Sequence, residues 1–163
     1  MKIKLTNFIP WLLINLVILS LYYSLIAYLF SDFPKEEPSF PQQGLWYFWS
    51  ILSHNITNYL QTVITFFLFP LNYLFVWGHS FLIISQEIKY FGISYAFDKL
   101  LPHGLIEFPL ILFYQYLSYR LLYLYIKRKS LKVLLNFILE NKYYFLSTVP
   151  IMALSAGLEA FIT

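Results

Sequence analysis

The chain has 163 residues, of which 60% are hydrophobic, 22% aromatic and only 12% charged, and its mean hydropathy is +0.64. Soluble domains carry roughly 25% charged residues, so the composition excludes a soluble globular protein and indicates a membrane protein in contact with the lipid bilayer. The chain has no cysteine, which excludes disulfides and thiolate sites, and its formal net charge of +3 is too small to suggest a nucleic-acid partner.

The first apolar run predicts a membrane-spanning helix over residues 8–30. No charged residue interrupts the run, and at about 1.5 Å per residue it exceeds the roughly 30 Å hydrocarbon core of a bilayer. Lys2 and Lys4 precede it without a cleavage site of small residues, so we expect a retained helix and not a signal peptide. Residues 31–44 carry three prolines and four charged residues and are expected to form an exposed loop.

Two further spans are predicted over residues 46–68 and 71–85, with Pro70 at the turn between them. Aromatic residues at the start of the earlier span are typical of the membrane interface. The later span is short and contains Gly78 and His79, so we expect it to be broken or shielded by its neighbours, with the histidine packed against them.

The second half of the chain predicts two spans and two surface helices. Residues 86–101 alternate charged and aromatic side chains, which favours an amphipathic helix lying in the interface, and residues 130–142 predict another. Spans are predicted over residues 103–126 and 143–163. The expected fold is therefore all-α, a polytopic integral membrane helical bundle with about five transmembrane helices plus two amphipathic interfacial helices in a single domain.

The distribution of lysine and arginine predicts the orientation. Lys2 and Lys4 precede the first predicted span, and a basic cluster at residues 127–129 follows the fourth. These groups lie on the same side if every span crosses the membrane once, and an excess of basic residues marks the cytoplasmic side. We therefore expect a multi-pass protein of the bacterial cytoplasmic membrane, with a cytoplasmic N-terminus and a C-terminus outside.

Ionisable side chains within the predicted spans are candidate site residues, because such a group costs roughly 2.5–3.5 kcal/mol at a helix centre. His103 and Glu107 are four residues apart and share one helix face. Counted from the outer ends of their spans, Glu107 and Glu159 lie at a similar depth, and His54 with Asn55 lies slightly deeper. The sequence predicts that these groups converge in the outer half of the membrane.

Three interpretations of this cluster remain open. In the first, Glu107, Glu159 and His103 are catalytic, with His54 and Asn55 as secondary candidates, because paired carboxyls can divide acid and base roles in attack on a peptide bond. In the second, the same histidines and glutamates bind a divalent metal, although the spacing of HGLIE is not that of HExxH. In the third, the carboxyls are kept neutral by burial and hydrogen-bonded between helices. No other cofactor is expected.

Two further features of the sequence bear on packing and energy supply. Gly157 lies among Ser155, Ala156 and Ala160, which predicts a close contact between helices at this point. The chain has no P-loop or glycine-rich phosphate cradle, so ATP hydrolysis would have to come from a partner.

Two stretches of the chain resemble one known family. LPHGLIEFP at residues 101–109 is similar to the LPHGxxE-type signature of the stage II sporulation protein M family, a group of multi-span bacterial and archaeal membrane proteins. AGLEAFIT at residues 156–163 resembles that family's closing A-x-x-E-A-x-I-T motif. The resemblance covers about residues 52–163, although the second and third spans lack the family's glycine-rich character.

The resemblance implies two functional contexts. Some members scaffold peptidoglycan hydrolases during engulfment in sporulating cells. Others, small like this chain, belong to circular bacteriocin clusters, where they act with an ATPase in maturation and export, and this chain resembles those more. The implied partners are a hydrophobic peptide precursor and an ABC-type or other ATPase, and the chain could form a homo-oligomer. His103, Glu107 and Glu159 would then remove the leader and join the peptide head to tail, or guide it outward, and the alternative is a non-catalytic scaffold.

Overall fold

The computed structural model describes residue 3, residues 5–31 and residues 43–162, without the side chains of residues 5, 99–103 and 162. Its elements in chain order are α1 (Leu5–Leu29), α2 (Leu45–Ile64), the 3₁₀ turn η1 (Phe66–Leu68), α3 (Phe69–Phe91), α4 (Ile93–Arg128), α5 (Leu131–Glu140) and α6 (Lys142–Ile162). The predicted all-α class is confirmed. Most of the loop expected at residues 31–44 lies outside the described residues.

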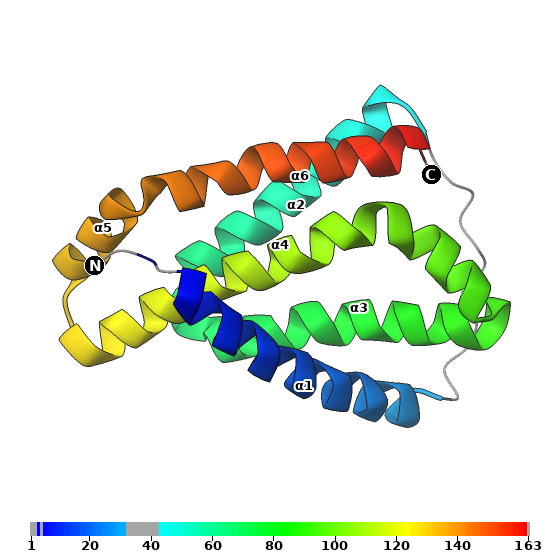
Figure 1. The fold of residues 1–163 in the computed structure, drawn as a ribbon, viewed down its shortest axis with the longest axis horizontal. Coiled ribbons are helices and arrows are strands. Elements are labelled where there is room, and N and C mark those ends of the chain that lie inside the picture. The colour runs from blue at the N-terminus through cyan, green and yellow to red at the C-terminus, as the bar shows by residue number, and fades with distance from the viewer. Residues whose placement is uncertain (1–2, 4, 32–42, 163) are drawn as a thin grey trace.

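The long helix α4 is the centre of the bundle. It packs against α2, α3 and α6 along its length, while α1 packs mainly on α3. Figure 1 shows the N-terminus and α5 at one end of the molecule, and the C-terminus with the α3–α4 turn at the opposite end. The two ends therefore differ: one carries the basic residues after α4, and the other carries the end of α6.

The third predicted span is not broken, so of the two alternatives expected for it, a broken span or one shielded by its neighbours, the first is wrong. The helix α3 is continuous from Phe69 to Phe91, and Gly78 lies within it. The hydroxyl of Tyr22 on α1 donates a hydrogen bond to the carbonyl oxygen of Leu74 at 3.0 Å, and a Cβ atom added at Gly78 would lie 2.6 Å from that hydroxyl. Gly78 therefore does not interrupt the helix but lets α1 and α3 approach closely.

The predicted interfacial helix over residues 86–101 does not exist as a separate element. Its residues are divided between the end of α3 and the beginning of α4, and Gly92, with φ of +87°, forms the turn between the two helices. Because glycine adopts this backbone conformation without steric cost, a single residue is enough to reverse the chain. The helix containing the fourth span consequently begins at Ile93 and has 36 residues. It changes direction after its first turns (Figure 1).

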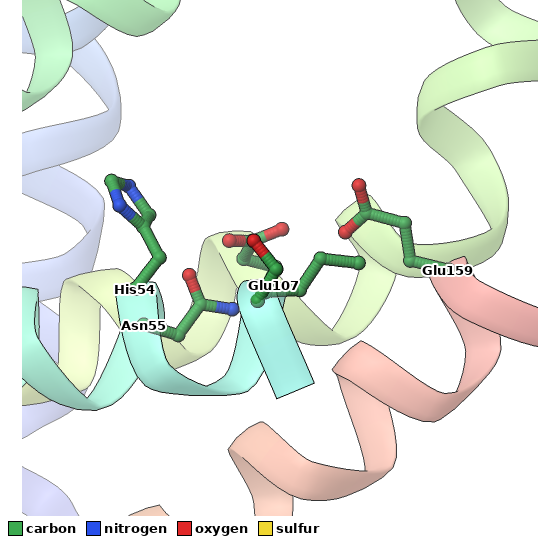
Figure 2. Close-up of a pocket in the computed structure, with 6 residues that line it drawn as sticks. His54, Asn55, Glu107 and Glu159 are labelled. Atoms are coloured by element: carbon green, nitrogen blue, oxygen red, sulfur yellow. The ribbon is translucent and has the colours of Figure 1, made fainter. Parts of the chain in front are cut away.

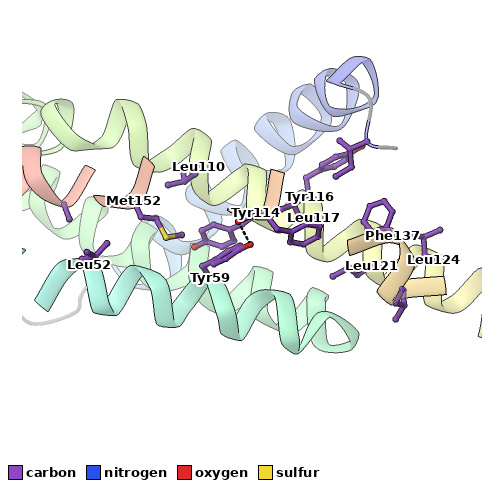
Figure 3. Close-up of a cluster of buried hydrophobic side chains, with 14 residues drawn as sticks. Leu52, Tyr59, Leu110, Tyr114, Tyr116, Leu117, Leu121, Leu124, Phe137 and Met152 are labelled. Atoms are coloured by element: carbon purple, nitrogen blue, oxygen red, sulfur yellow. Dashed lines mark hydrogen bonds between the residues drawn. The ribbon is translucent and has the colours of Figure 1, made fainter. Parts of the chain in front are cut away.

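The buried side chains form two clusters on either side of α4. The larger lies where α2, α4, α5 and α6 meet and includes Leu117, Leu121 and Leu124, each at most 1% exposed (Figure 3). The smaller lies between α1, α3 and α4 around Trp77, whose ring stacks on Phe108 with the ring centroids 5.5 Å apart. Helix α5, predicted from its apolar spacing, is present as Leu131–Glu140.

Among the residues that the structure describes, three segments are long and apolar enough to cross a membrane by length and composition: Thr6–Leu29, Phe66–Phe91 and Lys142–Phe161. The helices α2 and α4 are not among them. Polar side chains extend along most of α2, and they are Ser50, Ser53, His54, Asn55, Thr57, Asn58, Gln61 and Thr62. The described structure thus supports a membrane protein, and its candidate site involves the two less apolar long helices.

Candidate functional site

A cavity of about 300 Å³ lies between α2, α4 and α6. Its lining is mostly polar and consists of Ser50, Ile51, His54, Asn55, Glu107 and Glu159. It lies near the end of the molecule that holds the C-terminus, since Glu159 belongs to the last turns of α6. Figure 2 shows Glu107 between Asn55 on one side and Glu159 on the other. The predicted convergence of these residues from three helices is therefore found in the structure.

Glu107 lies on α4 at the point where the cavity narrows toward the core. Its carboxyl group is half-buried, close to the side-chain amide of Asn55 and close enough to Glu159 for electrostatic repulsion between two carboxylates. A narrow cleft continues inward from Asn55 and Glu107 and is lined at its far end by Tyr114 and Ser155. Glu107 thus separates an open polar cavity from a closed and mostly apolar cleft.

Glu159 is held in place by contacts between α2 and α6. The hydroxyl of Tyr47 donates a hydrogen bond to Glu159 Oε1 at 3.1 Å, and the backbone N–H of Gly44 donates to the carbonyl oxygen of Ala160 at 3.2 Å. Ala156 and Ala160 are fully buried, so the small side chains on this face of α6 allow the neighbouring helices to approach. Glu159 is therefore both part of the cavity wall and part of a helix contact.

His54 is exposed and bonds along its own helix. Its Nε2 lies 2.9 Å from the Nδ2 of Asn58, one turn further along α2. Asn58 in turn lines a second cavity of about 150 Å³ between α2 and α3, together with Gln61, Thr62, Asn72, Phe75 and Val76. The two cavities are thus connected through a hydrogen-bonded pair of side chains on α2.

The structure describes the side chains of all the predicted site residues except His103. His54, Asn55, Glu107 and Glu159 line one cavity. The side chain of His103 lies outside the described residues. The catalytic roles assigned to these residues stay predictions.

The sequence interpretation missed two residues of the site. Tyr47 is one of the aromatic residues at the start of the second predicted span that were expected at the membrane interface, but its hydroxyl donates a hydrogen bond to Glu159. Ser155 was assigned to a helix contact, but it lines the inner cleft, and its Oγ is buried without a hydrogen-bond partner in the described part of the chain. Spacing could have suggested Ser155, which lies one helical turn before Glu159.

Two packing predictions need correction. The close contact predicted around Gly157 is made by Ala156 and Ala160, which are fully buried, whereas a Cβ atom added at Gly157 itself would meet nothing within 4 Å. His79 is exposed on α3 and not packed, because Tyr73, Trp77 and Phe81 occupy the buried face of that helix. Both errors concern which side of a helix faces its neighbours, a property that residue type alone does not determine.

The arrangement of ligands gives the metal interpretation no direct support. Among the side chains that the structure describes, which do not include those of residues 99–103, no three of His, Asp or Glu are grouped closely enough to hold a metal ion. The chemistry that the described residues themselves offer is proton exchange and hydrogen bonding by two neighbouring carboxyls, an amide and an imidazole.

Comparison with known proteins gives one match. A family model of stage II sporulation protein M matches residues 8–163. Searches among curated proteins and among solved structures gave no match. The matched range extends the resemblance seen in the two sequence motifs to almost the whole chain.

Proposed function

Because the chain belongs to the stage II sporulation protein M family, we propose that it is a membrane component of circular bacteriocin maturation and export. In this role it acts on a hydrophobic peptide precursor, and a separate ATPase supplies energy, since the chain contains no nucleotide-binding motif. The observation that carries the proposal is the polar cavity between α2, α4 and α6, in which Glu107 and Glu159 lie close together.

The proposed topology has five crossings, made by α1, α2, α3, α4 and α6. The N-terminus and α5 lie at one end of the bundle and the C-terminus at the other, which is the arrangement that five crossings require (Figure 1). The basic residues Lys127, Arg128 and Lys129 end α4 beside α5, so the positive-inside rule assigns this end to the cytoplasm. The cavity would then open in the outer half of the bacterial cytoplasmic membrane.

The two carboxyls can serve maturation in two ways. In leader removal, one carboxylate accepts a proton from a water molecule that attacks the carbonyl carbon of the peptide bond, while the other carboxyl, protonated, donates to the nitrogen that leaves as the new amino terminus. In guidance of the peptide, the carboxyls and Asn55 bind its polar ends while the rest of the peptide remains among apolar side chains. Both versions require the carboxyls, and they differ in whether an uncleaved precursor accumulates.

The experiment replaces each carboxyl separately by an amide of the same size. Glu107→Gln and Glu159→Gln are expected to abolish mature peptide in a producing strain while the level of the protein in the membrane stays normal. Glu140→Gln on the exposed face of α5 is the matched control and is expected to leave the yield unchanged. Precursor retained with its leader indicates chemistry at the site, whereas processed peptide retained in the cell indicates guidance. Unchanged yield in both cavity variants would contradict the proposal.

One observation favours a second candidate, a non-catalytic scaffold of the engulfment type that recruits partner proteins. The hydrogen bond from Tyr47 to Glu159 and the bond between Gly44 and Ala160 join α2 to α6, which is a structural use of the same carboxyl. The Tyr47→Phe variant distinguishes the two candidate functions, because it removes the hydrogen bond between α2 and α6 and keeps both carboxyls. A scaffold is expected to lose activity in this variant and to tolerate Glu107→Gln.

A further inference from the structure

One side of α2 carries a row of polar side chains that no other helix covers. Ser50, His54 and Gln61 are exposed and Asn58 is half-buried, and the helical periodicity places all four on one side of α2. Helix α2 packs on α4 and α6, and two cavities lie along its polar row, the outer one bounded by α2, α4 and α6 and the inner one by α2 and α3. We call the row, with these two cavities, the α2 groove.

The facing wall of the α2 groove is formed by α3 and, at its outer end, by α4 and α6. Asn72 and Phe75 of α3 line the inner cavity, and the Asn72 amide donates a hydrogen bond to Thr65 Oγ1 at 2.7 Å, which fixes the base of the groove. His79 is exposed and lies one helical turn beyond Phe75 on the same helix. The outer cavity adds the two glutamates. The lining is therefore uncharged and rich in amides at one end and acidic at the other.

Contact between such a polar surface and lipid is energetically unfavourable. His54 and Asn58 bond to each other, but a polar group left without a hydrogen-bond partner in the hydrocarbon core costs several kcal/mol, so the exposed ends of the row must be covered by water or by a polar ligand. Amide side chains such as Asn58 and Gln61 present both a donor and an acceptor, which matches the alternating N–H and C=O groups of a polypeptide backbone. The groove therefore has the chemistry to replace the hydrogen bonds that a peptide loses when it leaves water.

The dimensions of the groove select an extended segment. From Ser50 to Gln61 the helix rises roughly 17 Å, the length of about five residues in extended conformation. The cavities measure about 300 and about 150 Å³. The amides of the row can pair with the free N–H and C=O groups of an extended segment, whereas a helix uses these groups for its own hydrogen bonds. This argues against a helix of a second copy of the chain as the occupant.

We propose that the α2 groove is a hydrated path in the membrane that binds an extended polypeptide segment by its backbone, with the acidic outer cavity receiving the segment's amino group or a basic side chain. The proposal rests on the proposed function, because it identifies where the peptide substrate lies. It assigns Asn58, Gln61 and Asn72 to backbone hydrogen bonding and gives His54 a place between the two cavities.

Hydration is tested with cysteines, since the natural chain has none and every introduced thiol reports alone. Gln61→Cys lies in the groove, and Leu60→Cys, 47% exposed on the neighbouring side of the same turn, is the matched control. A membrane-impermeant maleimide applied to membrane vesicles is expected to modify Gln61→Cys about tenfold faster than Leu60→Cys, because thiols react as thiolates, which form in water and not in lipid. Equal and slow modification of both would overturn the hydrated path.

Occupancy is tested by disulfide formation with a synthetic probe, an uncharged hydrophobic peptide of eight residues with one central cysteine. In proteoliposomes under mild oxidation, Ser50→Cys and Gln61→Cys are expected to form mixed disulfides with the probe, while Leu60→Cys does not. Adding Asn58→Leu is expected to lower the yield about tenfold through loss of a hydrogen bond. Disulfides between two copies of the chain at Gln61→Cys would mean that a second copy covers the groove, and would overturn the proposal, as would no mixed disulfide at all.

A yield assay keeps this proposal distinct from the proposed function. If deletion of the whole chain leaves the mature peptide unchanged, the proposed function fails, and the disulfide result still decides whether the groove binds peptide. If deletion abolishes the peptide but Asn58→Leu matures it normally and the probe does not react, the proposed function stands and the groove proposal fails.

Discussion

The two sides of α2 treat polar side chains in opposite ways. On the side facing the bundle, Tyr59 is 5% exposed and donates to the carbonyl oxygen of Phe145 at 2.9 Å, and the carbonyl oxygen of Thr62 accepts a hydrogen bond from Ser118 at 2.8 Å. On the groove side, Ser50 and Gln61 are exposed. The polar groups on the first side form hydrogen bonds between helices, and those on the second side are available to water or to a ligand outside the chain.

Within one helix, the buried polar side chains therefore have a structural role, whereas the exposed ones point to a role in binding. A polar group that is buried and paired contributes to the stability of the bundle, and its loss leaves a partner unsatisfied. A polar group exposed within a membrane protein adds little to stability, and its presence requires a reason outside packing. The comparison is tested by substitutions whose effects on stability should decrease from the buried contacts to the groove.

The largest loss of stability is expected at the contact of α6 with its neighbours. Ala156 is fully buried, so Ala156→Leu forces extra volume into a filled space and should lower the free energy of unfolding by about 3 kcal/mol. Gly157→Ala, at the next residue, places its Cβ atom in open space and should not lower the free energy of unfolding. Unfolding of the detergent-solubilised protein followed by circular dichroism measures both, and equal effects would show that the side of α6 has been assigned wrongly.

A smaller loss of stability is expected between α3 and α4, where two buried polar side chains are hydrogen-bonded to each other, as polar groups are on the inner side of α2. Trp77 Nε1 donates to Gln115 Oε1 at 2.7 Å, and both residues are 1% exposed. Trp77→Phe leaves the Gln115 amide without its partner in a closed space and should cost about 2 kcal/mol. Adding Gln115→Leu removes the stranded amide and should recover about 1 kcal/mol of this loss. Additive losses in the same unfolding assay would contradict a paired role.

The helical class and the convergence of the candidate site residues were predictable from the sequence. Apolar runs predict the helices, and a fixed rise per residue converts sequence position into depth, which is why Glu107 and Glu159 were expected at a similar level, with His54 and Asn55 slightly deeper. The meeting of these four side chains in one cavity confirms the expected convergence. The rotation of each helix about its axis was not predictable, so the contact of Tyr47 with Glu159 and the outward position of Gly157 were missed.

The wrong prediction of an interfacial helix over residues 86–101 has a different cause. Charged and aromatic residues alternate around Gly92, and this pattern is typical of a helix lying in the membrane interface. The same pattern is compatible with the ends of two packed helices, and only the backbone conformation of Gly92, with φ of +87°, distinguishes them. A single glycine among many apolar residues gives a weak turn signal, because a glycine within a helix is also tolerated, as Gly78 is in α3.

The smallest effect on stability is expected in the α2 groove. This variant tests the difference between the two sides of α2 most directly, because Tyr59 and Gln61 lie only two residues apart on opposite sides of the helix. Tyr59→Phe removes a buried hydrogen bond and should cost about 1 kcal/mol with little change in peptide maturation. Gln61→Leu removes an exposed amide and should change the free energy of unfolding by less than about 0.5 kcal/mol. Unfolding and peptide yield measured on the same preparations separate the two roles. A groove variant that is stable and inactive, beside an inner variant that is less stable and active, shows that the exposed polar row serves a ligand. A loss of stability in Gln61→Leu equal to that in Tyr59→Phe would show that the row is structural after all.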